Sequence, residues 1–314
     1  MPRAKRDYHL TEEMVELLGE FEENLILFEK SERTIKNYLD QMKRFIADND
    51  VKTIEDFTVR MNKLWWLRYV KETKEEGKIA ISTLNNNMKI YSSFYNFLKM
   101  NAYIEGDIPC KVCRVKQTKM YKGDDIFTEE EVRAMLRATD DKEFKNSGDD
   151  NIDLRNKTLV FLLCNTALRI DEVHKVRIED INLETNTLYV RGKGGKNNIT
   201  RKTNFNNIVK DLIIQLILVK PNRVFLFENY RGEPLSTQGI RKTWYKCQDV
   251  AGVKRRTPHN IRHFTGTKLV EKGVPIEKVR EILGHSSGSQ TAEKFYVQPN
   301  EDVSDTLSIL DIFE

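Results

Sequence analysis

Residues 186–204 read NTLYVRGKGGKNNITRKTN, and this stretch decides the fold class of the second half of the chain. Polar and apolar residues alternate over 186–191 and again over 198–204, which is typical of short strands. Between them, the glycine-rich turn 192–196 can reverse the chain, because glycine tolerates the backbone angles that tight turns need. The stretch therefore predicts a β-hairpin with a lysine at its tip.

The segments on both sides of the hairpin show the apolar spacing of amphipathic helices. Thr128 followed by Glu131 is a capping-box pattern that opens the first of them. Further helices are expected at 156–166, 170–176, 206–218, 236–251, 258–272 and 275–283. An apolar stripe on a short terminal helix is formed by Val303, Leu307, Leu310 and Phe313. This half is therefore predicted to be mixed α/β and mostly helical, with a small β-sheet.

The first hundred or so residues have only helical patterns. Apolar residues recur at three- and four-residue steps over 11–30, and Ser31 is suited to cap a second helix that runs to about residue 47. A third helix is expected around 61–76, and Ser82 can cap a fourth that runs to about Leu98. The pattern predicts a compact four-helix domain.

A basic segment without helical or strand periodicity separates these two regions. No acidic residue lies between its five cations, which are Lys111, Arg114, Lys116, Lys119 and Lys122. Such a segment is typical of a linker between domains. We therefore expect an N-terminal domain over 1–110, a basic linker over 111–124 and a second domain over 125–314.

Composition limits the class of protein. The 314 residues are 39% hydrophobic and 32% charged, enough apolar material for a sizeable core and more typical of two domains than one. No stretch approaches the roughly 20 apolar residues of a membrane span, and the first residues lack the apolar core of a signal peptide. These features favour a cytoplasmic protein. The net charge of +4 does not by itself indicate nucleic-acid binding.

The four cysteines are too few and too scattered for a disulfide framework, which favours a reducing compartment. The spacing Cys110-x-x-Cys113 invites a zinc interpretation. A structural zinc site needs four ligands, and no second Cys or His pair lies nearby in the sequence. We therefore expect this pair to belong to the linker and predict no metal site.

Five short motifs of the second domain occur in a characteristic order. They are Thr166-Ala-Leu-Arg169-Ile-Asp-Glu172, Gly192-Lys193-Gly194, His259-Asn-Ile-Arg262-His263, Leu283-Gly-His285-Ser and Tyr296. Each is unspecific alone, but as an ordered set they resemble the tyrosine recombinase and integrase family, which includes phage integrases and Xer-like recombinases. The N-terminal helices resemble the SAM-like core-binding domain of that family. The resemblance implies a DNA-binding first domain and a catalytic second domain.

The resemblance also implies roles for the cationic residues. Arg169 and Arg262 would bind the non-bridging oxygens of a DNA phosphate, for which a planar guanidinium is better suited than lysine. Lys193, at the hairpin tip, would protonate the leaving 5′-oxygen. Asn198 stands where the family commonly has an arginine, so the register of the turn leaves Lys196 as an alternative to Lys193.

The remaining roles concern the nucleophile and its neighbours. Tyr296 would attack the phosphate and form a 3′-phosphotyrosine, which requires nearby cations to favour a phenolate whose ordinary pKa is about 10. His259 would exchange a proton with this tyrosine, and His285 would hydrogen-bond the phosphate. Tyr296 lies about two residues further from His285 than is usual in the family. Glu172 would orient its neighbours rather than react.

The implied reaction needs neither a metal nor ATP, since the phosphotyrosine ester conserves the energy of the broken bond. The implied partners are double-stranded DNA with inverted-repeat core sites and three further copies of the chain, which form a homotetramer on two sites. Two alternatives stay open: a catalytically silent DNA-binding protein on the same fold, and a monomeric type IB topoisomerase. The terminal helix at 303–313 could dock on its own subunit or on a neighbour.

The linker cations are expected to bind DNA phosphates. Replacing Lys116 and Lys119 by Gln should flatten the slope of log K against log salt by about 0.9 for each phosphate that is no longer neutralised, because fewer counterions are released on binding. The change should be equal on specific and non-specific DNA. Titration of labelled duplexes at several salt concentrations measures the slope, and an unchanged slope would make the segment a solvated linker.

Overall fold

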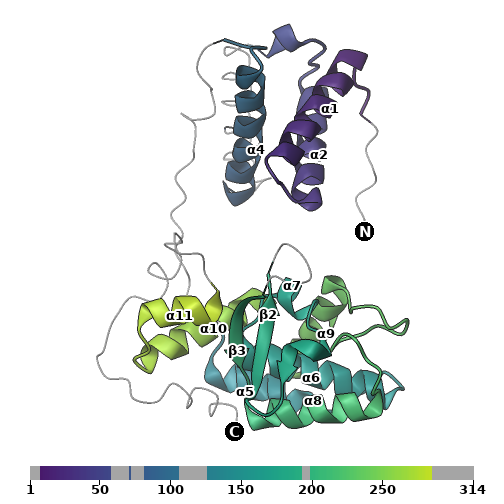
Figure 1. The fold of residues 1–314 in the computed structure, drawn as a ribbon, viewed down its shortest axis with the longest axis vertical. Coiled ribbons are helices and arrows are strands. Elements are labelled where there is room, and N and C mark those ends of the chain that lie inside the picture. Colours follow the sequence, from purple (N-terminus) through teal and green to yellow (C-terminus); the bar gives the residue numbers. More distant parts are fainter. Residues whose placement is uncertain (1–7, 58–70, 72–80, 106–125, 193–198, 285–314) are drawn as a thin grey trace. The chain divides into compact units, whose positions relative to one another are not determined.

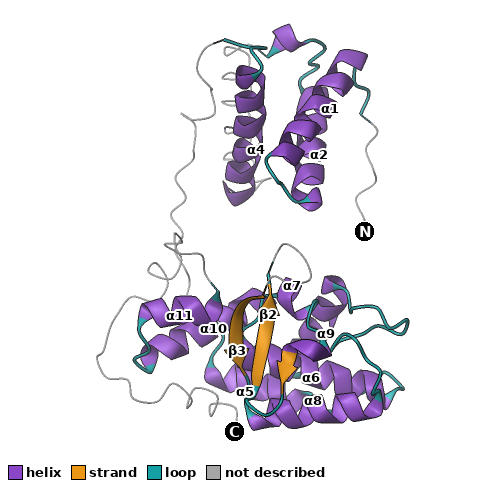
Figure 2. Ribbon diagram, in the orientation of Figure 1, coloured by secondary structure: helices purple, strands orange, loops and turns teal. Residues whose placement is uncertain are grey.

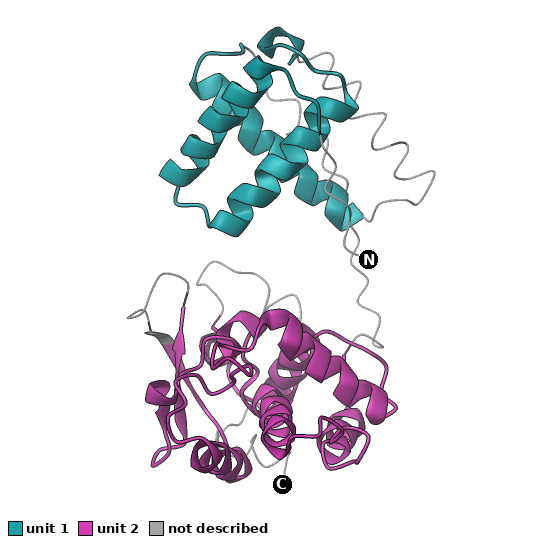
Figure 3. Ribbon diagram, turned by 90° about the vertical axis from the view of Figure 1, so that its right-hand side faces the viewer, with its two compact units in different colours: residues 1–120 teal, residues 121–314 magenta. Residues whose placement is uncertain are grey.

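The computed structural model describes residues 8–57, 71, 81–105, 126–192 and 199–284. The chain divides into two units, residues 1–120 and 121–314, which are coloured separately in Figure 3. Helices dominate both units, and the strands of the described residues all belong to the second (Figure 2). The predicted fold class, mainly helical with one small sheet beside the second set of helices, is confirmed.

Side-chain caps begin the first two helices of the first unit. Its described elements are α1 (Glu12–Leu27), α2 (Glu32–Asp48), a 3-10 turn (Ile54–Asp56) and α4 (Ile81–Met100). The Thr11 hydroxyl accepts a hydrogen bond from the Met14 amide, and the Ser31 hydroxyl accepts one from the Thr34 amide, each at 3.3 Å. The predicted cap at Ser31 is therefore confirmed.

Aromatic rings hold these helices together. The rings of Phe21 on α1 and Phe94 on α4 meet edge to face, with centroids 5.0 Å apart. Phe45 on α2 lies 4.8 Å from Tyr91 on α4 by the same measure. Such pairs add roughly 0.5–1.5 kcal/mol to the stabilisation from burial alone. The aromatic residues thus join α1, α2 and α4 around one core.

Two predictions for this unit have different outcomes. The helix expected at 61–76 falls outside the described residues, apart from Lys71. The expected cap at Ser82 is wrong, because α4 already includes Ile81 and Ser82 is a helical residue. Serine is common at the start of a helix but is also tolerated within one, so its presence alone did not determine the helix boundary.

The second unit contains the remaining elements (Figure 1). The helices before the sheet are α5 (Glu129–Ala138), α6 (Asp150–Thr166) and α7 (Ile170–Val173), followed by a 3-10 turn (Ile178–Asp180). Those after it are α8 (Asn207–Val219), α9 (Thr237–Val250), α10 (Pro258–Glu271) and α11 (Ile276–Leu283). The capping box of Thr128 and Glu131 opens α5 as predicted.

Helix α6 begins earlier than residue 156, where the apolar pattern placed it. Asp149 caps it by accepting a hydrogen bond from the Asn151 amide at 2.8 Å. The first turn is polar, so the apolar spacing showed only the later, buried turns. Helix α7 is shorter than predicted and ends at Val173.

The predicted hairpin is confirmed as strands β2 (Thr187–Arg191) and β3 (Ile199–Asn204), which pair antiparallel. Its tip, residues 193–198, lies outside the described residues. A two-residue strand that the sequence pattern did not predict, β1 (Ile181–Asn182), pairs with β2 and completes a sheet of order β1-β2-β3. Val190 lies opposite Arg201, and the register shifts between Val190 and Arg191.

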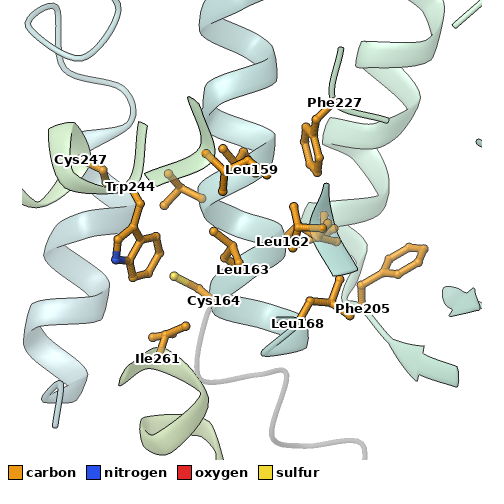
Figure 4. Close-up of a cluster of buried hydrophobic side chains, with 14 of the residues drawn as sticks. Leu159, Leu162, Leu163, Cys164, Leu168, Phe205, Phe227, Trp244, Cys247 and Ile261 are labelled. Atoms are coloured by element: carbon orange, nitrogen blue, oxygen red, sulfur yellow. The ribbon is translucent and has the colours of Figure 1, made fainter. Parts of the chain in front are cut away.

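Helix α6 lies at the centre of the main core of this unit. Figure 4 shows Leu163 and Cys164 of α6 among the side chains of Trp244 from α9 and Ile261 from α10. Cys164 and Trp244 are almost completely buried. Because Ile261 directly precedes Arg262, this packing fixes the position of the first turns of α10.

A smaller apolar cluster joins three helix ends. Its buried members are Ala167, Leu269, Val274, Val279 and Leu283. They come from the residue that ends α6, from α10 and the turn after it, and from α11. Figure 1 shows α10 and α11 side by side next to strand β3, in agreement with their contacts. The cluster brings the C-terminal end of α11 close to the end of α6, where the motif residues lie.

Candidate active site

Arg169 lies in a sharp turn between two helices. Ala167 ends α6 in the left-handed conformation, with φ +50°, and its amide donates to the Leu163 carbonyl at 3.2 Å. Arg169 then caps α7, and its amide donates to Glu172 Oε2 at 2.7 Å. The Arg169 guanidinium also donates to Glu172 Oε1 at 2.9 Å, yet its side chain remains 40% exposed. Arg169 is therefore positioned by the backbone and remains accessible to a ligand.

Arg262 approaches the same place from α10 but lies below the surface. It is only 2% exposed. Its guanidinium donates to the carbonyl of Ala167 and, at 2.5 Å, to the carbonyl of Leu283. One arginine thus links the end of α6 to the end of α11.

Carbonyl oxygens at the end of α11 bring the two motif arginines together. Arg262 donates to Leu283, and Arg169 donates to the next residue, Gly284, at 2.6 Å. The last carbonyls of a helix lack partners within the helix and carry partial negative charge. Two guanidinium groups therefore meet at one helix terminus, immediately before His285 in the sequence.

A third arginine, Arg201 of β3, joins this cluster, and the motif pattern did not reveal it. Its Nε donates to the Ile282 carbonyl at 3.1 Å. Its two terminal nitrogens donate to the two oxygens of Glu172 at 2.8 and 3.0 Å. The alternation of β3 places Arg201 and Lys202 on opposite faces, but that pattern alone does not indicate which face is buried.

The charges around Glu172 and His259 shift both of their pKa values. Burial alone would raise the pKa of Glu172, but the side-chain hydrogen bonding and charge of Arg201, followed by the backbone and side-chain hydrogen bonds of Arg169, lower it to about 2. Partial desolvation of the imidazole lowers the pKa of His259, and the positive charges of Arg262 and Arg169 lower it further. At neutral pH, Glu172 is therefore an anion and His259 is a neutral base that can accept a proton.

Of the predicted site residues, the structure brings together Arg169, Glu172, His259 and Arg262. His259 and Arg262 lie one turn apart on α10, as the HxxR spacing predicts, and the ring of His259 also meets His263 with centroids 4.7 Å apart. The other predicted residues lie outside the described residues: Lys193 with its alternative Lys196, His285, Tyr296, the five linker cations and the Cys110–Cys113 pair.

The described residues bear on both a membrane span and a metal site. They contain no helix with the length and apolar character needed to cross a bilayer. The same residues contain no group of three or more His, Cys, Asp or Glu side chains arranged to hold a metal ion.

Comparison with known proteins relates this site to a family. Residues 125–302 match the model of the phage integrase family. Tyrosine recombinase XerC of Oceanobacillus iheyensis is 30% identical over 223 residues, covering 69% of this chain and 70% of the relative. Tyrosine recombinase XerA of Pyrococcus horikoshii is 28% identical over 285 residues, covering 88% and 87%.

Solved structures share the fold at lower sequence identity. The Tn1549 transposon integrase, solved in complex with transposon right end DNA, has a TM-score of 0.66 and is 18% identical, covering 90% of this chain and 95% of that chain. A lambda integrase tetramer bound to a Holliday junction also has a TM-score of 0.66, with 16% identity and coverage of 93% and 79%.

Gly284 should be required for the arginine cluster. Its φ is +61°, and a Cβ there would lie 2.8 Å from Nη1 of Arg201. Gly284→Ala should therefore cost about 1–3 kcal/mol of stability from backbone strain and also displace Arg201. Urea unfolding and DNA-cleavage assays measure the two effects.

Gly252→Ala is the matched control for this substitution. Gly252 has a similar φ of +66°, but a Cβ there has no atom within 4 Å. The control should lose comparable stability and keep normal cleavage. Equal cleavage by the two variants would show that the approach of Arg201 to Gly284 has no catalytic consequence.

Proposed function

This chain belongs to the phage integrase family and is a site-specific DNA recombinase of the tyrosine type; we propose that it cuts and rejoins DNA through a covalent link to Tyr296. The observation that carries the proposal is the meeting of Arg169 and Arg262 at the carbonyls of Gly284 and Leu283, with His259 under the influence of both charges. Concentrated positive charge beside a neutral base suits attack on a phosphodiester.

The two arginines are proposed to act on the phosphate from different depths. Arg169 has a 40% exposed side chain and would meet the phosphate first, whereas the buried Arg262 would act from beneath. Guanidinium groups donate in a planar fork that matches phosphate oxygens. Both are positioned by main-chain carbonyls, so little rearrangement of the protein is needed when negative charge develops on the phosphorane.

We assign the proton transfers to His259 and Lys193, and a hydrogen bond to the phosphate to His285. Neutral His259 accepts the phenolic proton as the Tyr296 oxygen attacks phosphorus, and Lys193 gives a proton to the departing 5′-oxygen. His285 follows Gly284 directly and is proposed to hydrogen-bond the same phosphate. Rejoining reverses these transfers: a 5′-hydroxyl attacks the 3′-phosphotyrosine and the tyrosine leaves. The reaction is proposed to use no metal and no ATP.

Complete strand exchange requires more than one subunit, because each chain supplies one proposed nucleophile and recombination cuts four strands. We therefore propose a homotetramer on two double-stranded sites with inverted-repeat cores. The lambda integrase tetramer bound to a Holliday junction supports this stoichiometry through its similar fold. The first unit and the basic linker are proposed to bind DNA together with the catalytic unit.

Tyr296→Phe tests the covalent step. Incubated with a nicked suicide substrate, the native protein should form an adduct that survives denaturing electrophoresis, with or without EDTA. The Phe variant should bind the same DNA within about twofold and form no adduct, because only the attacking oxygen is removed. An adduct with the variant would move the nucleophile elsewhere.

The native protein provides a second test of the activity itself. Absence of any native adduct would favour a silent DNA-binding protein. If monomers of the native protein relaxed a supercoiled plasmid that lacks paired sites, the result would favour a topoisomerase.

Deletion of residues 303–314 tests the assembly. The apolar stripe at Val303, Leu307, Leu310 and Phe313 needs a partner surface, which we propose is the adjacent subunit. The truncated chain should bind a half-site nearly as well as the native one but lose cooperative binding to full sites and strand exchange, measured by gel shift and recombination assays. Unfolding of the truncated chain, or its normal assembly on full sites, would assign the stripe to its own domain.

A further inference from the structure

Arg201 lies outside the sequence motifs but joins three elements of the site. It belongs to β3, binds both oxygens of Glu172 on α7 and donates to the Ile282 carbonyl in α11. Its side chain is 7% exposed and that of Glu172 is 12% exposed. A bidentate pair with so little solvent is geometrically well defined.

We propose that Arg201 is a positioning residue for DNA cleavage that balances the charge of Glu172 and so preserves the positive charge of Arg169 for the phosphate. The proposal rests on the proposed function. Glu172 Oε1 accepts from Arg169 at 2.9 Å and from Arg201 at 2.8 Å, so two cations share one carboxylate. The three groups together carry a net charge of +1.

Removal of the Arg201 charge would change the electrostatic role of Glu172. The carboxylate would then have Arg169 as its remaining partner among these groups, and the pair would be neutral. An incoming phosphate would have to compete with Glu172 for Arg169, at a partly buried position where charge interactions are strong. Glu172 would change from a residue that orients Arg169 into one that neutralises it.

Arg201 also connects the hairpin to the turn that precedes His285. The neighbouring strand has its own anchor, because Arg191 at the end of β2 binds the buried Asp180 with nitrogen-to-oxygen distances of 2.6–2.9 Å. In the described residues, Arg191 is bonded to the 3-10 turn, whereas Arg201 reaches Glu172 and α11. The two arginines therefore anchor one hairpin, and within the described part of the chain the hairpin's hydrogen bonds to Glu172 and α11 come from Arg201.

The test is a set of variants of the full chain, assayed by single-turnover cleavage of a suicide substrate. Arg201→Gln should reduce the cleavage rate by about 10²-fold, comparable to the loss of one oxyanion donor, with DNA affinity changed by less than about threefold. Arg201→Lys keeps the charge without the fork and should lose only about 10-fold. The double variant Arg201→Gln with Glu172→Gln should recover about 10-fold over Arg201→Gln alone, because Arg169 is no longer neutralised.

Arg191→Gln is the matched control, since it releases the same hairpin without touching Glu172. Its cleavage defect should not be repaired by Glu172→Gln. Urea unfolding of every variant measures its stability and checks that each protein is folded under the assay conditions. If Arg201 had only a structural role, the cleavage rates of the variants would follow their stabilities, and Glu172→Gln would not rescue Arg201→Gln.

The outcomes separate this inference from the proposed function. If native protein forms no adduct, the proposed function is wrong. If native protein cleaves DNA and Arg201→Gln cleaves at the native rate, or the double variant is no better than the single one, the inference about Arg201 is wrong while the function stands.

Discussion

The second unit depends on one interaction: the carbonyl oxygens that end α11 bind arginines from three different elements. Ile282 accepts from Arg201 of β3, Leu283 accepts from Arg262 of α10, and Gly284 accepts from Arg169 ahead of α7. Helix ends leave carbonyls without intrahelical partners, so guanidinium groups satisfy them at no cost to the helix. A strand, two helices and a helix terminus thereby meet at one point.

This arrangement concentrates positive charge before any DNA is bound. Glu172 compensates one of the three guanidinium charges and is shared by two of them. The remaining charge is unfavourable for the isolated protein, and the apolar cores around α6 and α11 offset it. In the proposed function, a polyanionic substrate would reverse the sign of this effect. The same positive charges that repel one another in the free protein would then favour the complex with a phosphodiester.

Local chemistry made much of the fold predictable from the sequence. Alternation indicated β2 and β3, capping patterns indicated the starts of α2 and α5, and HxxR spacing placed His259 and Arg262 on one helix. Arg201 was not predictable, because its partners lie 29 and 81 residues away and strand alternation does not identify the buried face. Strand β1 was missed for a similar reason, since two residues are too short to show a period.

The most direct test of this preorganised cluster is arginine Nε–Hε NMR on the full chain, without DNA. The Arg201 signal is identified by its absence in Arg201→Lys. We expect it to be well dispersed and to exchange with water much more slowly than the signal of the exposed Arg33, because its hydrogen is held by the Ile282 carbonyl. If the two signals exchange equally fast, the arginines are not fixed before DNA binds, and the account of the site is wrong.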